Sequence, residues 1–332
     1  MGAVGLHWLL PGKGLTQERV VVIMAAALFI GFSIFLTGFF SVSNLIGLVR
    51  NICVLGILGV GMGLVIIGRG IDLSMISILA ISAAYFIELL GQGLPIWSGF
   101  LFVLMLVVLV GAINGFLVAY GEIPPIFATL AMGLFVYGFG RSQLMGQDVA
   151  FIPPEFTTLL ALGTLKLWGV PLEVFVFVAV CLVATVFLKF TKFGRYVYYI
   201  GDNFAAARNL GIPVRPMLVL QYVACALFAS VAGAIVALNL QSMNTRIVNS
   251  TLLYDVILIV VLGGIGLSGG KGGIRNVVFG ALLIGILVNA MTILDFEDTH
   301  QNLIKALILL AAIMTDTLLN QRDEQTEKQG DI

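Results

Sequence analysis

The sequence predicts an all-α polytopic membrane protein with about ten transmembrane helices, some of them broken. Of its 332 residues, 60% are hydrophobic and 10% are charged, and the mean hydropathy is +1.11. Several charge-free intervals reach the length of about 20 residues that a helix needs to cross the hydrocarbon core. The strand-length alternation of apolar and polar residues that is typical of a membrane β-barrel does not appear.

The apolar runs predict ten membrane spans in chain order. We expect them at residues 20–40, 48–68, 73–91, 96–120, 123–140, 171–190, 216–238, 252–268, 274–294 and 301–319. The first run is longer than the apolar region of a secretion signal, and no small-residue cleavage pattern follows it, so we expect it to remain as a helix. The shorter spans are typical of helices that are interrupted or enclosed by other helices.

The ten spans predict one transmembrane domain over residues 1–332, surrounded by membrane lipid. Twelve of the 17 basic residues face one side if the amino terminus is cytoplasmic, and this bias favours a cytoplasmic position for both termini. We therefore expect a cytoplasmic segment at 1–19, an external loop at 141–170, a cytoplasmic loop at 191–215 and a cytoplasmic tail at 320–332.

The residues that usually carry catalysis or bind metals are scarce. Cys53, Cys181 and Cys225 lie inside apolar runs, where we expect them to act as small hydrophobic residues. Neither His7 nor His300 has a ligand-like neighbour at helical spacing. No disulfide framework or metal site is indicated, and we expect no catalytic residue, no cofactor and no nucleic-acid partner.

The chain has 39 glycines, and many of them lie within the predicted spans. Most of them indicate close packing between helices. One pair of segments also indicates a weak internal repeat of two halves. The sequence of residues 70–74, GIDLS, resembles that of residues 264–268, GIGLS, and each segment lies between two apolar runs. Paired interruptions of this kind are common near the translocation path of transporters.

The charged stretch at residues 68–77, GRGIDLSMIS, interrupts two apolar runs. An ionisable side chain inside a membrane is costly and is a candidate functional group. Arg69 and Asp72 pair across one helical turn in one interpretation. In the other, both lie in a tight turn at the cytoplasmic interface, and Asp72 caps the following helix.

Polar residues within or beside apolar runs are further candidates to line a translocation path. Together with Asp72 we select Ser74, Asn114 and Thr129, although hydrogen bonding between helices is the commoner role of such residues. Asp255 lies near the end of a span, where we expect its carboxylate to be solvated.

The loop at residues 193–216 predicts a short, bounded helix on the cytoplasmic face. Asp202 or Asn203 caps it, the alanine-rich segment from Phe204 continues it, Gly211 ends it and Pro213 prevents its resumption. One interpretation is an ordinary surface loop that follows the charge rule for cytoplasmic segments. The other is a docking element, because small side chains on an exposed helix permit close insertion into a partner.

This loop resembles the coupling-helix region of ABC importer permeases, which reads roughly G-x-N-x-x-A-A-x-x-x-G-I in their sugar branch. The matching residues are Gly201, Asn203, Ala206, Ala207, Gly211 and Ile212. Three other segments, at 68–77, 111–133 and 260–287, resemble further segments of the same family in the same order. The chain is thereby similar to the permease subunits of ribose-type monosaccharide ABC importers.

The resemblance implies several partners and a location. It implies separate ATPase subunits gripping the coupling loop, a second permease copy or a sibling permease, a periplasmic sugar-binding protein, and the bacterial inner membrane. Leu267 to Lys271 read like an ATPase signature, but no phosphate-binding loop accompanies them, so we expect a transport subunit and not an enzyme.

The chain also departs from the family pattern. Arg69 replaces a common glycine, and Met75 and Ile76 stand where a glycine usually follows the Asp-Leu-Ser segment. These changes lie where substrate contacts are expected, and they leave the identity of the sugar or polyol open. The alternative function is an ion-coupled secondary transporter of a small polar solute, which would depend on essential intramembrane carboxylates and on no ATPase.

Overall fold

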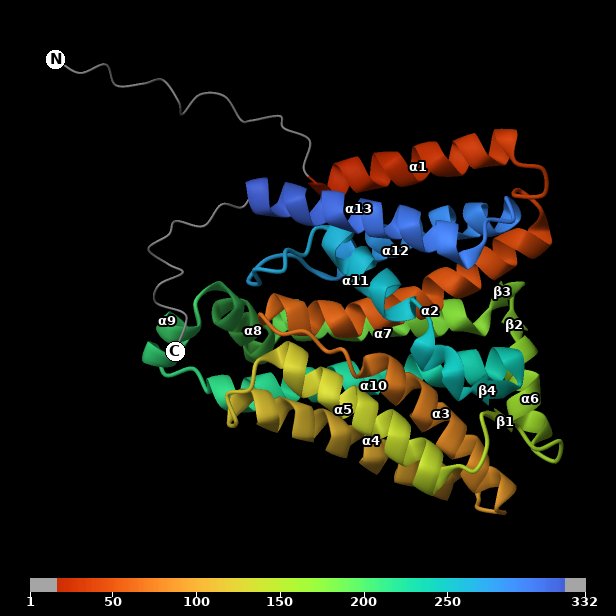
Figure 1. The fold of residues 1–332 in the computed structure, drawn as a ribbon, viewed down its shortest axis with the longest axis horizontal. Helices are drawn as coiled ribbons and strands as arrows, with labels where there is room; N and C mark the ends of the chain where they lie inside the picture. Colours follow the sequence, from red (N-terminus) through yellow and green to blue (C-terminus); the bar gives the residue numbers. More distant parts are fainter. Residues whose placement is uncertain (1–16, 320–332) are drawn as a thin grey trace.

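The computed structural model describes residues 17–319, and these form one bundle of mostly elongated helices (Figure 1). The predicted tail at 320–332 and nearly all of the predicted segment at 1–19 lie outside the described residues. Ten helices correspond one to one to the predicted spans: α1 (Gln17–Phe35), α2 (Val42–Ile67), α3 (Met75–Gly91), α4 (Ile96–Ala119), α5 (Pro125–Phe139), α7 (Leu172–Phe190), α10 (Val214–Leu240), α11 (Leu252–Gly263), α12 (Ile274–Ile293) and α13 (Asp298–Leu319).

The all-α membrane fold is thus confirmed, while some span limits differ from the prediction. Within residues 17–319, six helices are long and apolar enough to cross a membrane, namely α1, α2, α4, α7, α10 and α12, and α3 and α11 are apolar but shorter. The span predicted to reach residue 268 ends at Gly263, because Gly264 adopts a left-handed conformation with φ 101°. The first span likewise ends at Phe35, five residues before the predicted limit of 40.

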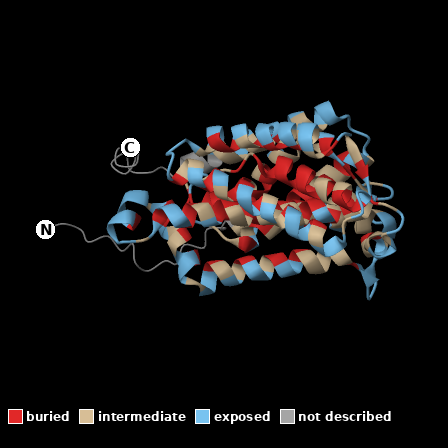
Figure 2. Cartoon of the chain, turned by 90° about the horizontal axis from the view of Figure 1, so that it is seen from below, coloured by how far each residue is buried: buried red, intermediate tan, exposed pale blue. Residues whose placement is uncertain are grey.

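Helices α2 and α10 occupy the centre of the bundle. α2 is buried almost throughout its second half and packs against α7, α10, α11 and α12, while α10 packs against α2, α3 and α4. Figure 2 shows the buried residues gathered in the inner helices and the exposed residues on the outer ones. The exposed side chains of the outer helices are largely apolar, as a lipid-facing surface requires.

Glycines allow these central helices to approach closely. A Cβ atom added to Gly111 of α4 would lie 2.7 Å from the Cα atom of Val223, and one added to Gly115 would overlap Val219, both on α10. Because the two glycines are four residues apart, they lie on one face of α4. The predicted role of such glycines in tight packing is confirmed here.

The connections gather at the two ends of the bundle (Figure 1). One end carries the short helices α8 (Lys192–Asp202) and α9 (Phe204–Asn209), and α1 begins and α13 ends towards it. The other end carries α6 (Thr157–Thr164), the π-helix η1 (Gly140–Leu144), the 3-10 helix η2 (Thr245–Asn249), and the strands β1 (Val149–Phe151), β2 (Lys166–Leu167), β3 (Val170–Pro171) and β4 (Ser242–Asn244). The predicted loops at 141–170 and 191–215 therefore lie at opposite ends.

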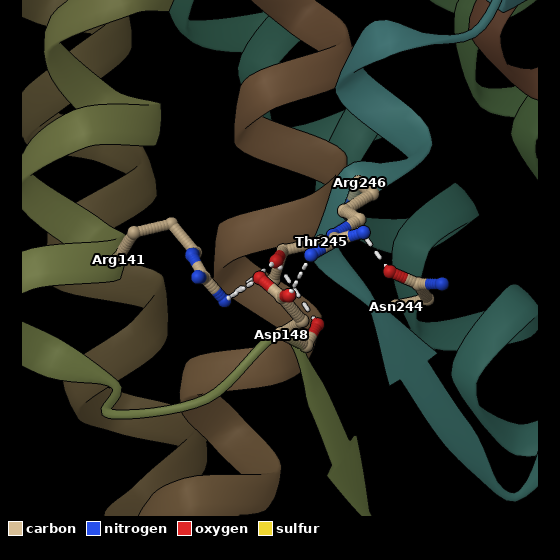
Figure 3. A network of polar contacts seen from close by, with 5 residues as sticks. All are labelled: Arg141, Asp148, Asn244, Thr245 and Arg246. Carbon is tan, nitrogen blue, oxygen red and sulfur yellow. Dashed lines mark hydrogen bonds and ion pairs between the residues drawn. The ribbon is translucent and has the colours of Figure 1, made fainter.

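A polar network of five residues, drawn in Figure 3, lies at the end opposite α8 and α9. Strand β1 pairs antiparallel with β4, and the carboxylate of Asp148, just before β1, forms ion pairs with Arg141 and with Arg246, the latter at 2.6 Å. The backbone carbonyl of Asp148 also accepts bonds from the N–H and hydroxyl groups of Thr245, at 2.9 and 3.0 Å. The long loop is thus fastened to the connection between α10 and α11.

Candidate functional site

Helix α9 is fixed at both of its ends, as the sequence predicts. Asn203, and not Asp202, is its N-cap: its Oδ1 atom accepts a hydrogen bond of 2.9 Å from the N–H of Ala206. At the other end Gly211 adopts φ 75°, and its N–H and that of Ile212 donate back into the helix at 3.0 and 3.1 Å. The result is a rigid element of less than two turns.

The six residues matched to the coupling motif differ in accessibility. Ala206 and Gly211 are exposed, and Asn203 and Ile212 are half-buried, whereas Ala207 and Gly201 are buried. The buried pair therefore holds the element in place and offers no surface to a partner. The outward surface of α9 consists of Phe204, Ala205, Ala206, Arg208, Asn209 and Leu210.

Gly201 joins α8 to two distant segments of the chain. A Cβ atom at this position would overlap the carbonyl oxygen of Ile67 and lie 2.5 Å from the backbone nitrogen of Gly270. The N–H of Gly270 itself donates to that carbonyl at 2.8 Å. Tyr198 adds a second link, since its hydroxyl donates to the carbonyl of Gly272 at 2.9 Å. Burial raises the pKa of the Tyr198 phenol, so it remains a neutral donor.

The two residues that Gly201 contacts, Ile67 and Gly270, lie next to the segments of the predicted repeat, 70–74 and 264–268. Helix α2 ends with Arg69 at φ 66°, and α11 ends with Gly264 at φ 101°. In each case that residue and the next, Gly70 or Ile265, donate to carbonyls of the last turn, at 2.9 Å for α2 and at 3.0 and 3.1 Å for α11. Both helices therefore end in the same capping motif. In the structure Arg69 corresponds to Gly264, whereas the similarity of GIDLS to GIGLS pairs Gly70 with Gly264. The two alignments therefore differ by one residue.

The four candidate path residues, selected from three different segments, form one buried cluster. Asp72, Ser74, Asn114 and Thr129 are each 0% exposed. Oδ1 of Asp72 accepts bonds from the N–H and the hydroxyl of Ser74, at 3.0 and 2.6 Å, and the side-chain amide of Asn114 donates to that hydroxyl oxygen at 2.7 Å. Thr129 accepts a bond of 3.0 Å from the N–H of Leu73.

This geometry favours the second interpretation of the charged stretch, a tight turn, over a pair on one helical turn. Arg69 closes α2 in a left-handed conformation and residues 70–72 are not helical, so Arg69 and Asp72 do not share a helical turn. Asp72 instead stabilises the turn that precedes α3. The side chain of Asp72 is fully buried within the bundle, and its position at the cytoplasmic interface stays a prediction.

Two acceptor atoms of the cluster lack a protein partner. Neither Oδ2 of Asp72 nor Oδ1 of Asn114 accepts a hydrogen bond from the described residues. Buried polar atoms are nearly always paired, so unpaired ones call for an explanation. Both atoms are acceptors, and their natural complement is a group that donates hydrogen bonds, such as a hydroxyl.

Two ion pairs between helices are not predicted from the sequence. Lys305 of α13 lies 2.8 Å from the carboxylate of Asp255 on α11, and Arg50 of α2 lies 3.3 Å from that of Glu173 on α7. The expectation that Asp255 is solvated is wrong, since only 8% of this residue is exposed. The available signal was the occurrence of opposite charges in separate apolar spans, but nothing in the sequence says which spans are neighbours.

A bundle of apolar helices that encloses a buried polar cluster is typical of a membrane transport protein. The chain belongs to the family described as the permease component of the branched-chain amino acid transport system, which matches residues 44–313. It is therefore a multi-pass permease of the inner membrane, a transport component and not an enzyme.

Curated relatives extend the match to almost the whole chain. It is 34% identical over 312 residues to the ribose import permease protein RbsC of Haemophilus influenzae, covering 94% of this chain and 96% of the relative. It is 34% identical over 310 residues to RbsC of Escherichia coli, covering 93% and 94%. It is 32% identical over 298 residues to the L-arabinose transport system permease protein AraH of Escherichia coli, covering 89% of each. No solved structure matches. The resemblance to ribose-type permeases is thus confirmed.

Proposed function

We propose that this chain is the membrane-spanning subunit of an ABC importer and forms the translocation path for a monosaccharide or a related polyol. The observation that carries the proposal is a capped surface helix, α9, which is joined to α8, whose Gly201 packs against the end of α2 and against the segment between α11 and α12. A separate ATPase that binds α9 would act through α8 on the end of α2 and on the segment between α11 and α12. A transporter driven by an ion gradient alone needs no docking helix for a separate ATPase.

The buried cluster supports a hydroxyl-bearing substrate. Its side chains are a carboxylate, an amide and two hydroxyls, and its two unpaired atoms are acceptors. Sugar hydroxyls donate to such atoms. A branched-chain amino acid, which the family description names, would call for an apolar pocket and for donors to its carboxylate. The relatives that import ribose and L-arabinose point in the same direction.

The coupling pathway runs from α9 to this cluster. A displacement of α9 moves α8, to which it is joined at Asn203, and α8 contacts the end of α2 through Gly201. The segment between α2 and α3 carries Asp72 and Ser74. A shift there rearranges the cluster that α4 and α5 complete with Asn114 and Thr129. ATP hydrolysis itself takes place in the partner.

The assembly follows from this function. Two permease copies, or this chain and a sibling, surround the path within the lipid bilayer. The α9 end and both termini face the cytoplasm, and the end that carries the β1 and β4 strands receives a periplasmic sugar-binding protein. The excess of basic residues expected on the α9 side supports this orientation.

The test is an arginine placed on the docking helix. Ala206→Arg adds a bulky charge to the exposed face of α9 and should abolish both ATPase co-purification and uptake, while the subunit remains in the membrane. Gln92→Arg adds the same charge at the exposed connection between α3 and α4 and serves as the control. Unchanged uptake in Ala206→Arg would overturn the docking role. Uptake of branched-chain amino acids and of no sugar or polyol by the complete importer would overturn the substrate class.

A further inference from the structure

An apolar groove runs along the outer surface between α4 and α10. Its volume is about 550 Å³, and it lies where α4 approaches its end and α10 begins. Both helices reach the α9 end of the bundle at this level (Figure 1). The residues that line it are Ala112, Ile113, Phe116, Tyr120, Pro216 and Val219.

A larger cleft of about 1020 Å³ lies next to the groove. Tyr120 and Pro216 line both, so the two hollows are neighbours on the surface. Unlike the groove, the cleft is basic: its charged lining consists of Arg69, Arg208, Arg215 and Glu122. One surface feature therefore changes from apolar to positively charged along its length.

Tyr120 and Arg215 mark the boundary between the two parts. The guanidinium of Arg215 lies 5.4 Å from the centre of the Tyr120 ring and pairs with Glu122 at 3.0 Å. Tyrosine and arginine with an apolar body and a polar tip are typical of the level where a bilayer meets water. The apolar groove then lies at the depth of the acyl chains, and the cleft lies at the depth of the headgroups.

We propose that groove and cleft together hold one anionic glycerophospholipid, with an acyl chain between α4 and α10 and the phosphate beside Arg208 and Arg215. A zwitterionic lipid fits the cleft less well, because the positive group of its head would be repelled by the arginines there. A soluble phosphate has no acyl chain and would leave the apolar groove empty. Basic pockets between helices on the cytoplasmic side are suited to anionic headgroups.

This site would link membrane composition to coupling. Arg208 belongs to the outward surface of α9, and Arg69 closes α2 beside the buried cluster, so the headgroup contacts both ends of the proposed coupling pathway. Binding of the lipid requires neither the ATPase nor a substrate. It can be measured on the purified chain alone, and its failure would leave the proposed transport function untouched.

The experiment is native mass spectrometry of the purified chain titrated with phosphatidylglycerol and, separately, with phosphatidylcholine. We expect one phosphatidylglycerol to bind with marked preference. The double variant Arg208→Gln and Arg215→Gln should weaken it about thirtyfold, because each basic residue near an anionic headgroup contributes about 1 kcal/mol. The control Arg195→Gln removes one exposed charge from α8 outside the cleft and should have no effect.

A second variant separates a lipid from a free anion. Ala112→Phe fills the groove and should lower phosphatidylglycerol binding, whereas Ala131→Phe on the exposed face of α5 should not. Equal binding of the two lipids, or displacement of bound phosphatidylglycerol by glycerol 3-phosphate with no effect of Ala112→Phe, would overturn the proposal. So would a cross-link between the Ile113 positions of two copies, since it would show that a second copy covers the groove.

Discussion

Replacing Gly201 by valine should lower solute uptake and leave binding of the ATPase subunit unchanged. The new side chain would overlap the carbonyl of Ile67 and push against the backbone of Gly270, whose hydrogen bond of 2.8 Å to that carbonyl would break. Overpacking costs about 1–3 kcal/mol, and one lost hydrogen bond adds about 1 kcal/mol. The contact of α8 with the end of α2 and with the segment between α11 and α12 is therefore weakened by about 2–4 kcal/mol, a factor of about 30 to 1,000.

The outward surface of α9 is unchanged by this substitution, so the ATPase should still bind and hydrolyse ATP. Uptake into proteoliposomes should fall at least about thirtyfold, following the weakened contact. Gly47→Ala is the control, because a Cβ atom on that residue of α2 meets no atom within 4 Å. Uptake that stays normal in Gly201→Val, in a subunit of normal abundance, would refute the idea that motion passes through this contact.

Three further substitutions test the site and its support. Asn203→Ala removes the N-cap of α9 and should weaken ATPase affinity by about 1 kcal/mol, measured by titration of the reconstituted subunit; an unchanged affinity would show that the cap is dispensable. Asp72→Ala leaves the Ser74 donors without their acceptor and should lower the thermal midpoint more than Asp72→Asn, which retains an acceptor oxygen; equal midpoints would contradict this. Asp255→Ala leaves the buried Lys305 ammonium without its carboxylate, with the Thr251 hydroxyl as its remaining partner, at a cost of about 3–5 kcal/mol; Lys305→Leu added to it should restore much of the stability, and no recovery would argue against an ion pair as the cause.

The sequence predicts the helices well because each span is a run of apolar residues long enough to be recognised without knowing its neighbours. All ten apolar runs are helices, and the boundaries of α9 follow from Asn203 and Gly211, whose capping roles are local. The end of α11 was placed too late because Gly264 stands in an uninterrupted apolar run, where only its left-handed conformation stops the helix.

What the sequence cannot predict depends on contacts between distant segments. The coupling motif names Gly201, but only the structure shows that its missing side chain admits the end of α2 and the backbone of Gly270. Asp72 and Asn114 were selected separately as polar residues, and their meeting through Ser74 is a consequence of packing α3 against α4. The burial of Asp255 likewise depends on α13 lying beside α11.

The central claim is that a separate ATP-driven motor moves α9 and that the chain has no other source of energy. The most direct measurement is solute uptake into proteoliposomes containing the purified chain, with and without its ATPase subunits, internal ATP and the sugar-binding protein, and with an imposed proton or sodium gradient. We predict accumulation only when the ATPase, ATP and the binding protein are all present. Accumulation against a concentration gradient by the chain alone, driven by the ion gradient, would contradict the claim.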